Sequence, residues 1–379
     1  MTPILPLIAA VPLVAGLVGV MPSGSMAASG AGQAVTRNET PSLTSSLTST
    51  GVVQHVAART VAEQRRVLGY WTAGRMARAL PGGALGSVTK VAELASGVLP
   101  LRVTATRGST VAPSSTASSG STVAPVPPPS SAGRAPSAVR ASSASGASAP
   151  GMNTSGARWA AGGAVKRTTG RVFLTLRGVD YVCSASAVRS RNQDVVVTAG
   201  HCAKDGSGTW AENWTFVPAY EPGRQPYGVF TARRMFVPEP WSESGDDSYD
   251  LGMVAVNPSG GSHLNEAVGG QEIGFNVPRG GRAFGFGFPA DPPYDGRRLI
   301  YCAGDLHHDP HSQTRDQGMR CDLTAGSSGG PWLSSFDPAT GQGVLTSVSS
   351  FKYSDDDGTM YGPYFGDQAK RLFDTAQRA

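Results

Sequence analysis

Short apolar runs separated by turn-forming residues fill the chain from residue 171 to its end. The run Val195–Thr198 has the length and composition of a buried strand, and Arg171–Leu176 and Tyr181–Ala185 flank a predicted turn at 178–180. Only 367–378 has the pattern of a good terminal helix. Many short strands between Gly, Pro, Asn and Asp predict an all-β sandwich or barrel. The other predicted strands lie at 214–217, 228–231, 251–256, 283–288, 299–302, 344–350 and 360–365.

The first 165 residues have a different composition, rich in Gly, Ser, Ala and Pro. Residues 104–163 bury too little apolar surface to offset their chain entropy, so we expect a disordered linker there. Residues 4–20 are apolar and lead into small residues up to 28, which is typical of a secretory signal peptide, although no Lys or Arg precedes them. A retained anchor is the alternative for this segment. Val52–Arg66 lacks Gly and Pro and predicts a helix.

Charge and cysteine content restrict the classes of function. The net charge of +5 is scattered, with no basic stripe interleaved with aromatic residues, which argues against nucleic-acid binding. The four cysteines, at 183, 202, 302 and 321, form no C-x-x-C pair, which argues against zinc. Two disulfides in an oxidising compartment fit this pattern better. The segment 307–311 contains three histidines, but Pro310 interrupts it, and a solvated loop is favoured over a metal site.

A serine with glycines on both sides is the strongest sign of chemistry. In the stretch Thr324–Trp332, the glycines permit a tight turn that projects Ser328 and points backbone N–H groups at one spot. A serine hydroxyl needs a base and a residue that orients the base. His201, directly after a predicted buried strand, and Asp250, directly before another, are the candidates. Each residue has an alternative interpretation. His201 could be a structural core histidine, and Ser328 could lie in an ordinary Gly-rich turn. Asp250 could be a strand cap, with Asp246 or Asp247 as the catalytic carboxylate instead.

These three contexts, in the order His, Asp, Ser, resemble the trypsin/chymotrypsin-like serine peptidases and are close to their secreted bacterial branch, which includes glutamyl endopeptidases. The resemblance implies two antiparallel six-stranded β-barrels and a C-terminal helix, preceded by a disordered pro-region. It also implies a secreted, monomeric endopeptidase that acts on proteins or peptides without a cofactor, metal, nucleic acid or stable membrane association. Because 70–76 resembles a segment that precedes such catalytic domains, the expected parts are a signal peptide at 1–28, a partly helical pro-region at 29–103, a linker at 104–163 and a peptidase domain at 164–379.

The resemblance also implies roles for individual residues. His201 is the expected general base, Asp250 orients it, Ser328 is the nucleophile, and the backbone N–H groups of Gly326 and Ser328 form the oxyanion hole. It pairs Cys183 with Cys202 and Cys302 with Cys321. A non-catalytic secreted or surface-displayed binding protein on a peptidase fold is the alternative function.

The expected specificity pocket rests on fewer residues. Asp322 lies six residues before Ser328, where trypsins place the carboxylate that binds Arg or Lys. Ser350 is expected on the opposite wall and Gly362 at an open pocket mouth. Lys352, or a histidine of 307–311, offers the opposite preference, for an acidic side chain. Ser327 replaces the aspartate that captures a new N-terminal amine in trypsins, so activation by that route is not expected.

Overall fold

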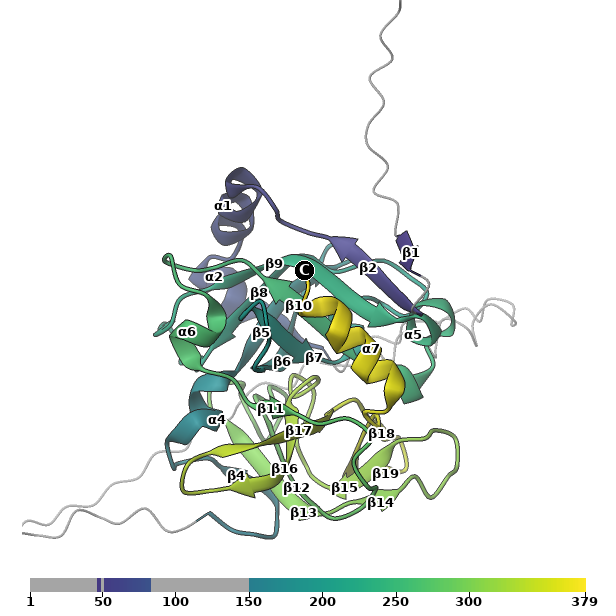
Figure 1. Ribbon diagram of the computed structural model, residues 1–379. Coiled ribbons are helices and arrows are strands. Elements are labelled where there is room, and N and C mark those ends of the chain that lie inside the picture. The colour runs from purple at the N-terminus through teal and green to yellow at the C-terminus, as the bar shows by residue number, and fades with distance from the viewer. Residues whose placement is uncertain (1–45, 49–50, 83–149) are drawn as a thin grey trace, which may run out of the picture. The chain divides into compact units, whose positions relative to one another are not determined.

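The computed structural model describes residues 46–48, 51–82 and 150–379, which form a mostly β molecule with few helices (Figure 1). All of these described residues belong to one compact unit. The expected signal peptide and residues 104–149 of the expected linker lie outside the described residues. Among the described helices, none has the length and apolar character needed to span a bilayer.

The first lobe is a closed six-stranded barrel. Its strands pair in an antiparallel ring in which β8 also pairs with β9 and so closes the barrel. The β5–β6 hairpin turns at Arg177 and Gly178, which both have positive φ, as the twist of a two-residue hairpin requires. In ring order the strands are β5 (Thr169–Leu176), β6 (Val179–Ala187), β7 (Val195–Thr198), β10 (Gly252–Val256), β9 (Phe230–Pro238) and β8 (Glu212–Pro218).

The second lobe is more open than expected. It consists of two sheets rather than one six-stranded barrel, and its β11–β17 pair is parallel. The all-β class, a closed six-stranded barrel and the C-terminal helix are confirmed, and the described strands of the second lobe form the further sheets. One sheet contains β11 (Glu272–Ile273), β17 (Gln342–Val348), β16 (Pro331–Asp337), β12 (Arg282–Gly287), β13 (Ile300–Asp305) and β4 (Thr154–Arg158). The other contains β14 (His307–His308), β15 (Gln317–Arg320), β19 (Asp356–Gly362) and β18 (Phe351–Tyr353).

Part of the segment expected to be linker is folded. Strand β4 lies inside the segment assigned to the linker, yet it pairs with β13. Trp159 follows it, is 5% exposed and packs edge-on against Phe286 at a ring distance of 5.3 Å. Backbone pairing and one large aromatic side chain therefore order a segment whose composition alone predicts disorder.

Residues 51–82, called the strap below, lie against the first lobe (purple in Figure 1). The predicted helix over Val52–Arg66 is wrong in its first half, because β2 (Val52–Val56) pairs with β9 instead. Helix α1 (Val61–Tyr70) begins after Thr60, whose side chain forms a reciprocal capping box with Glu63. The other strap elements are α2 (Ala73–Arg78) and β3 (Leu80–Pro81), and β1 (Ser46–Thr48) pairs with β2.

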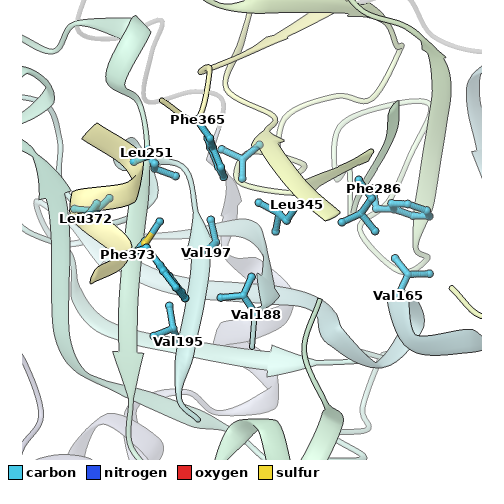
Figure 2. Close-up of a cluster of buried hydrophobic side chains, with 14 of the residues drawn as sticks. Val165, Val188, Val195, Val197, Leu251, Phe286, Leu345, Phe365, Leu372 and Phe373 are labelled. Carbon is cyan, nitrogen blue, oxygen red and sulfur yellow. The ribbon is translucent and has the colours of Figure 1, made fainter. Parts of the chain in front are cut away.

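The two lobes and the C-terminal helix share one apolar core (Figure 2). The first lobe contributes valines of β7, the second contributes Phe286 and Leu345, and α7 (Asp367–Ala376) adds Leu372 and Phe373. Each of these aliphatic or aromatic side chains stabilises the fold by about 1.5–3 kcal/mol when fully buried. The core therefore fixes the first lobe against the second. The short helices are α4 (Gly163–Thr168), α5 (Glu239–Ser244), α6 (Leu264–Val268), η1 (Gly200–Cys202) and η2 (Asp247–Tyr249).

Candidate active site

His201 and Asp250 come together in the first lobe. His201 lies in η1 directly after β7, and Asp250 lies between η2 and β10. His201 Nδ1 is 2.8 Å from Asp250 Oδ2, and the His201 backbone N–H donates to Asp250 Oδ1 at 2.7 Å. The Ser350 hydroxyl also donates to Asp250 Oδ2. Asp250 is only 2% exposed, so three donors fix a buried carboxylate beside the imidazole.

The charges of this pair stabilise each other. Burial lowers the pKa of His201, but the Asp250 carboxylate and its hydrogen bond raise that pKa to a net value above the ordinary one. Burial opposes ionisation of Asp250, yet His201 and the Ser350 hydroxyl hold its pKa below the usual range. The imidazole thus becomes a stronger base than a free histidine, and the carboxylate stays ionised.

The close approach of the pair depends on a glycine. A Cβ at Gly200 would lie 2.9 Å from both Asp250 Oδ1 and Trp241 Nε1. Trp241 is buried and donates its indole N–H to the Lys204 carbonyl at 2.9 Å, which holds the ring against the His201 turn. The second position of the Ala-Gly-His-Cys sequence is therefore a glycine for a steric reason: any side chain there would clash with Asp250 and Trp241.

Ser328 lies in the second lobe, on the loop between β15 and β16, and the first lobe holds this loop on two sides. The Ser184 N–H of β6 donates to the Ser328 carbonyl at 2.8 Å, and the Ser184 hydroxyl donates to the Gly326 carbonyl at 2.9 Å. Cys202 Sγ, next to His201, lies 3.8 Å from the Ser328 carbonyl oxygen. A Cβ at Gly329 would lie 2.1 Å from Thr198 Oγ1, so the residue after Ser328 packs against the start of the His201 turn.

The loop presents free backbone donors. Gly326 has φ +95°, which favours glycine and turns the chain sharply before the serine. Within the described residues, neither the Gly326 N–H nor the Ser328 N–H donates a backbone hydrogen bond. His201 Nε2 is also buried and has no hydrogen-bond partner there. The site thus combines an available base nitrogen with two available donors.

Ser327 has a local role. It is 1% exposed, and its hydroxyl donates to the Thr324 carbonyl at 2.7 Å. This hydroxyl stabilises the turn and carries no charge for an inserted amine.

The expected pocket residues have mixed outcomes. Asp322 is exposed, accepts a 2.8 Å hydrogen bond from the Tyr294 hydroxyl, and raises the pKa of Tyr294 together with burial. Burial lowers the pKa of Lys352, and the nearby Asp322 opposes this. Ser350 binds Asp250, as described above. Gly362 forms no open mouth, because it is buried and a Cβ there would lie 2.1 Å from the Val348 carbonyl oxygen.

The sequence pattern did not identify three residues near the site. Ser184 and Trp241 hold the two loops in place but belong to no motif. Asp316 is 1% exposed, and neither of its carboxylate oxygens has a hydrogen-bond partner among the described residues. Burial, with Asp250 as the next cause, raises the pKa of Asp316 to about 8. A buried acid of this kind gives no signal in a sequence, since its environment is created by distant segments.

Two solved structures resemble this chain in both sequence and fold. The protease Anisep from Arthrobacter nicotinovorans is 38% identical, with a TM-score of 0.54, and the match covers 56% of this chain and 96% of that one. The thermostable serine protease AL20 from an extremophilic microorganism is 36% identical, with a TM-score of 0.54, and the match covers 57% and 99%. This chain belongs to the chymotrypsin-like bacterial serine proteases. The resemblance expected from the three sequence contexts is confirmed.

The comparison with curated proteins adds a different name. An extracellular metalloprotease of Bacillus subtilis is 31% identical over 114 residues, which are 30% of this chain. The chain matches only about a third of that protein's length, at 35%. A scan against protein-family models finds no match.

The donor set near the site does not fit a metal centre. Among the described residues, the potential metal ligands that lie close enough together are Cys183, His201 and Cys202. The sulfurs of Cys183 and Cys202 form a disulfide, as do those of Cys302 and Cys321, so both implied pairings are present. A disulfide sulfur is not the thiolate that zinc binds.

Proposed function

We propose that this protein is a serine endopeptidase in which Ser328 attacks the peptide carbonyl. The observation that carries the proposal is the junction of the two lobes. The first lobe, which carries the His201–Asp250 pair, is joined to the Ser328 loop of the second lobe by the 2.8 Å hydrogen bond that the Ser184 N–H donates to the Ser328 carbonyl. This junction argues against a silent binding protein, because a binding surface requires neither the ordered imidazole nor the free backbone donors.

In the proposed mechanism, formation and hydrolysis of the acyl-enzyme each involve two proton transfers through His201. His201 Nε2 takes the Ser328 hydroxyl proton as Oγ attacks the carbonyl carbon, and the Gly326 and Ser328 N–H groups stabilise the oxyanion. His201 then gives the proton to the leaving amine, and an acyl-serine forms. A water molecule, deprotonated by His201, then attacks the acyl-serine ester. His201 returns the proton to Ser328 Oγ, and the carboxylic acid product is released. Asp250 keeps Nδ1 protonated and stabilises the imidazolium, consistent with the raised pKa of His201.

We propose protein or peptide substrates, a monomer, and secretion after removal of residues 1–28. The two disulfides support an oxidising compartment. For the residue before the cleaved bond, we propose a preference for Arg or Lys read by Asp322. Because Asp322 is exposed and close to the Lys352 charge, the preference should be modest.

Hydrolysis of a diverse peptide library tests the proposal. The purified protein should cleave internal bonds, a fluorophosphonate should abolish the cleavage, and a strong chelator should leave it unchanged. Inhibition by the chelator alone would support the metalloprotease name instead. No cleavage by folded protein would support the binding-protein alternative.

A further inference from the structure

The end of the strap occupies an edge that leads to the candidate nucleophile. Strand β6 pairs with β5 from Val179 to Ser186, but β7 pairs only with its Ser186 and Ala187. On that side the edge at Tyr181 and Val182 is filled by β3 of the strap, in parallel register. The Gly82 N–H then donates to the Val182 carbonyl at 2.8 Å.

This edge continues directly to Ser328. Residues two apart in a strand present their backbone groups to the same edge, and they are about 7 Å apart. Val182 accepts from Gly82, and Ser184, two residues on, donates to the Ser328 carbonyl. Gly82 thus binds β6 one strand repeat away from Ser184, the residue that binds the Ser328 carbonyl.

The strap end is also beside the histidine loop. A Cβ at Gly82 would lie 2.8 Å from Cys183 Sγ, and Cys183 is bonded to Cys202, the neighbour of His201. His201 protonates the leaving amine in the proposed mechanism, so the leaving half of a substrate must pass this face of the cleft. An extended peptide binds best where a strand edge offers free backbone groups, and here the strap has taken them.

The rest of the strap holds this end in place from outside the cleft. The Tyr70 hydroxyl donates to Asp180 at 2.7 Å, and Arg75 pairs with the same carboxylate at 3.2 Å. The Trp71 indole N–H donates to the Asn213 carbonyl, and its ring packs on Phe173 at 5.5 Å. These contacts lie on the first barrel and leave the His201–Asp250 pair formed.

We propose that the strap is a partial self-inhibitor: residues 80–82 fill the leaving-group side of the cleft along β6 and exclude substrates that extend past the cleaved bond. The inference rests on the proposed function. The His201–Asp250 pair and the Ser328 loop are already in place beside the strap, and the strap closes only the channel for the leaving peptide. The surface that a leaving peptide would use is the edge of β6 at Tyr181 and Val182, which β3 of the strap now covers. Displacement of the strap end opens it.

Two substrates with the same acyl part test this inference on the unprocessed full chain, with its mass verified before each assay. The acyl part is taken from the library profile. One substrate is a methyl ester, and the other continues with two amino acids. The parent protein should hydrolyse the ester and discriminate against the extended peptide. Gly82→Ala should raise the extended-to-ester ratio of kcat/KM by about tenfold, the factor that corresponds to about 1.4 kcal/mol.

The matched control is Gly69→Ala, because Gly69 has no atom within 4 Å of an added Cβ. It should leave the ratio unchanged. Asp180→Ala, which removes the Tyr70 and Arg75 contacts, should raise the ratio as Gly82→Ala does. An unchanged ratio in both Gly82→Ala and Asp180→Ala, with the ester still hydrolysed, would overturn self-inhibition and leave the proposed function standing. Absence of ester hydrolysis in the folded parent would overturn the proposed function and this inference with it.

Discussion

The two lobes contribute to the site in different ways. The first lobe is a closed barrel covered by the strap, and it carries the His201–Asp250 pair. The buried Asp250 carboxylate accepts two hydrogen bonds from His201 and a third from Ser350 of the second lobe. The second lobe is two open sheets, and it supplies Ser328 on a loop with unpaired backbone donors. Proton transfer therefore relies on the His201–Asp250 pair, which hydrogen bonds hold in place. The nucleophile instead depends on a loop that the first lobe must position. Neither lobe contains a complete site.

The largest expected effect comes from removing either half. Ser328→Ala in the second lobe and His201→Ala in the first should each lower kcat by roughly 10⁴- to 10⁶-fold, because the groups act as a unit. The double variant should be no worse than the single ones. The measurement is hydrolysis of a library-derived peptide, with circular dichroism to verify folding. Additive losses would show that the lobes act independently.

The next effect isolates the orienting group of the first lobe. Asp250→Asn should lower kcat by roughly 10⁴-fold, because the amide favours the wrong His201 tautomer. The control is Asp246→Asn, since an amide oxygen can still accept the 3.0 Å hydrogen bond from the Ser248 N–H. Equal losses in the two variants would remove Asp250 from its assigned role.

Asp316, a buried acid of the second lobe, should make the free energy of unfolding of the protein depend on pH. The pKa of Asp316 is about 8 in the folded chain and 3.8 ordinarily, so unfolding releases its proton between these values. Its contribution to the free energy of unfolding is complete below about 3.8 and is lost as pH rises through about 8. Urea unfolding at pH 5 and pH 9 should show a loss of a few kcal/mol for the parent and a smaller one for Asp316→Asn. The same loss in both proteins would contradict the burial of an unpaired acid.

Each lobe contains one disulfide, so removing them one at a time compares the contributions of the two lobes to stability and activity. Each closes a loop of 19 residues, and its removal by paired Cys→Ala changes should cost about 3 kcal/mol of unfolding free energy. Activity should fall more without Cys183–Cys202, which adjoins His201, than without Cys302–Cys321. Urea unfolding and kcat/KM measure the two effects. A larger loss of activity for the second bridge would reverse the comparison.

The smallest effect concerns Asp322. Asp322→Ser should lower the ratio of Arg to Glu cleavage by no more than about fivefold, since an exposed ion pair contributes at most about 1 kcal/mol. Paired chromogenic substrates measure the ratio. Faster cleavage after Glu by the parent, or an unchanged ratio in the variant, would reject Asp322 as the reader of a basic side chain.

Sequence patterns predicted the parts of the molecule in which local and long-range preferences agree. The bounds of Val195–Thr198 are as predicted, and the terminal helix begins at Asp367 as predicted. Strands β2 and β4 were missed because neighbours decide them: β9 pairs with a Gly-free segment that has helical composition, and β13 pairs with a segment of linker composition. The three candidate residues stand in local motifs, whereas Ser184, Trp241 and Asp316 act through contacts between distant segments.

The adduct that a fluorophosphonate forms, and the rate at which it forms, test most directly whether His201 of one lobe activates Ser328 of the other. We expect a single adduct on Ser328, found by peptide mass mapping, with a rate that falls by orders of magnitude in His201→Ala although that change lies in the other lobe. An adduct on a different residue, or the same rate in His201→Ala, would contradict a nucleophile in one lobe activated by a base in the other.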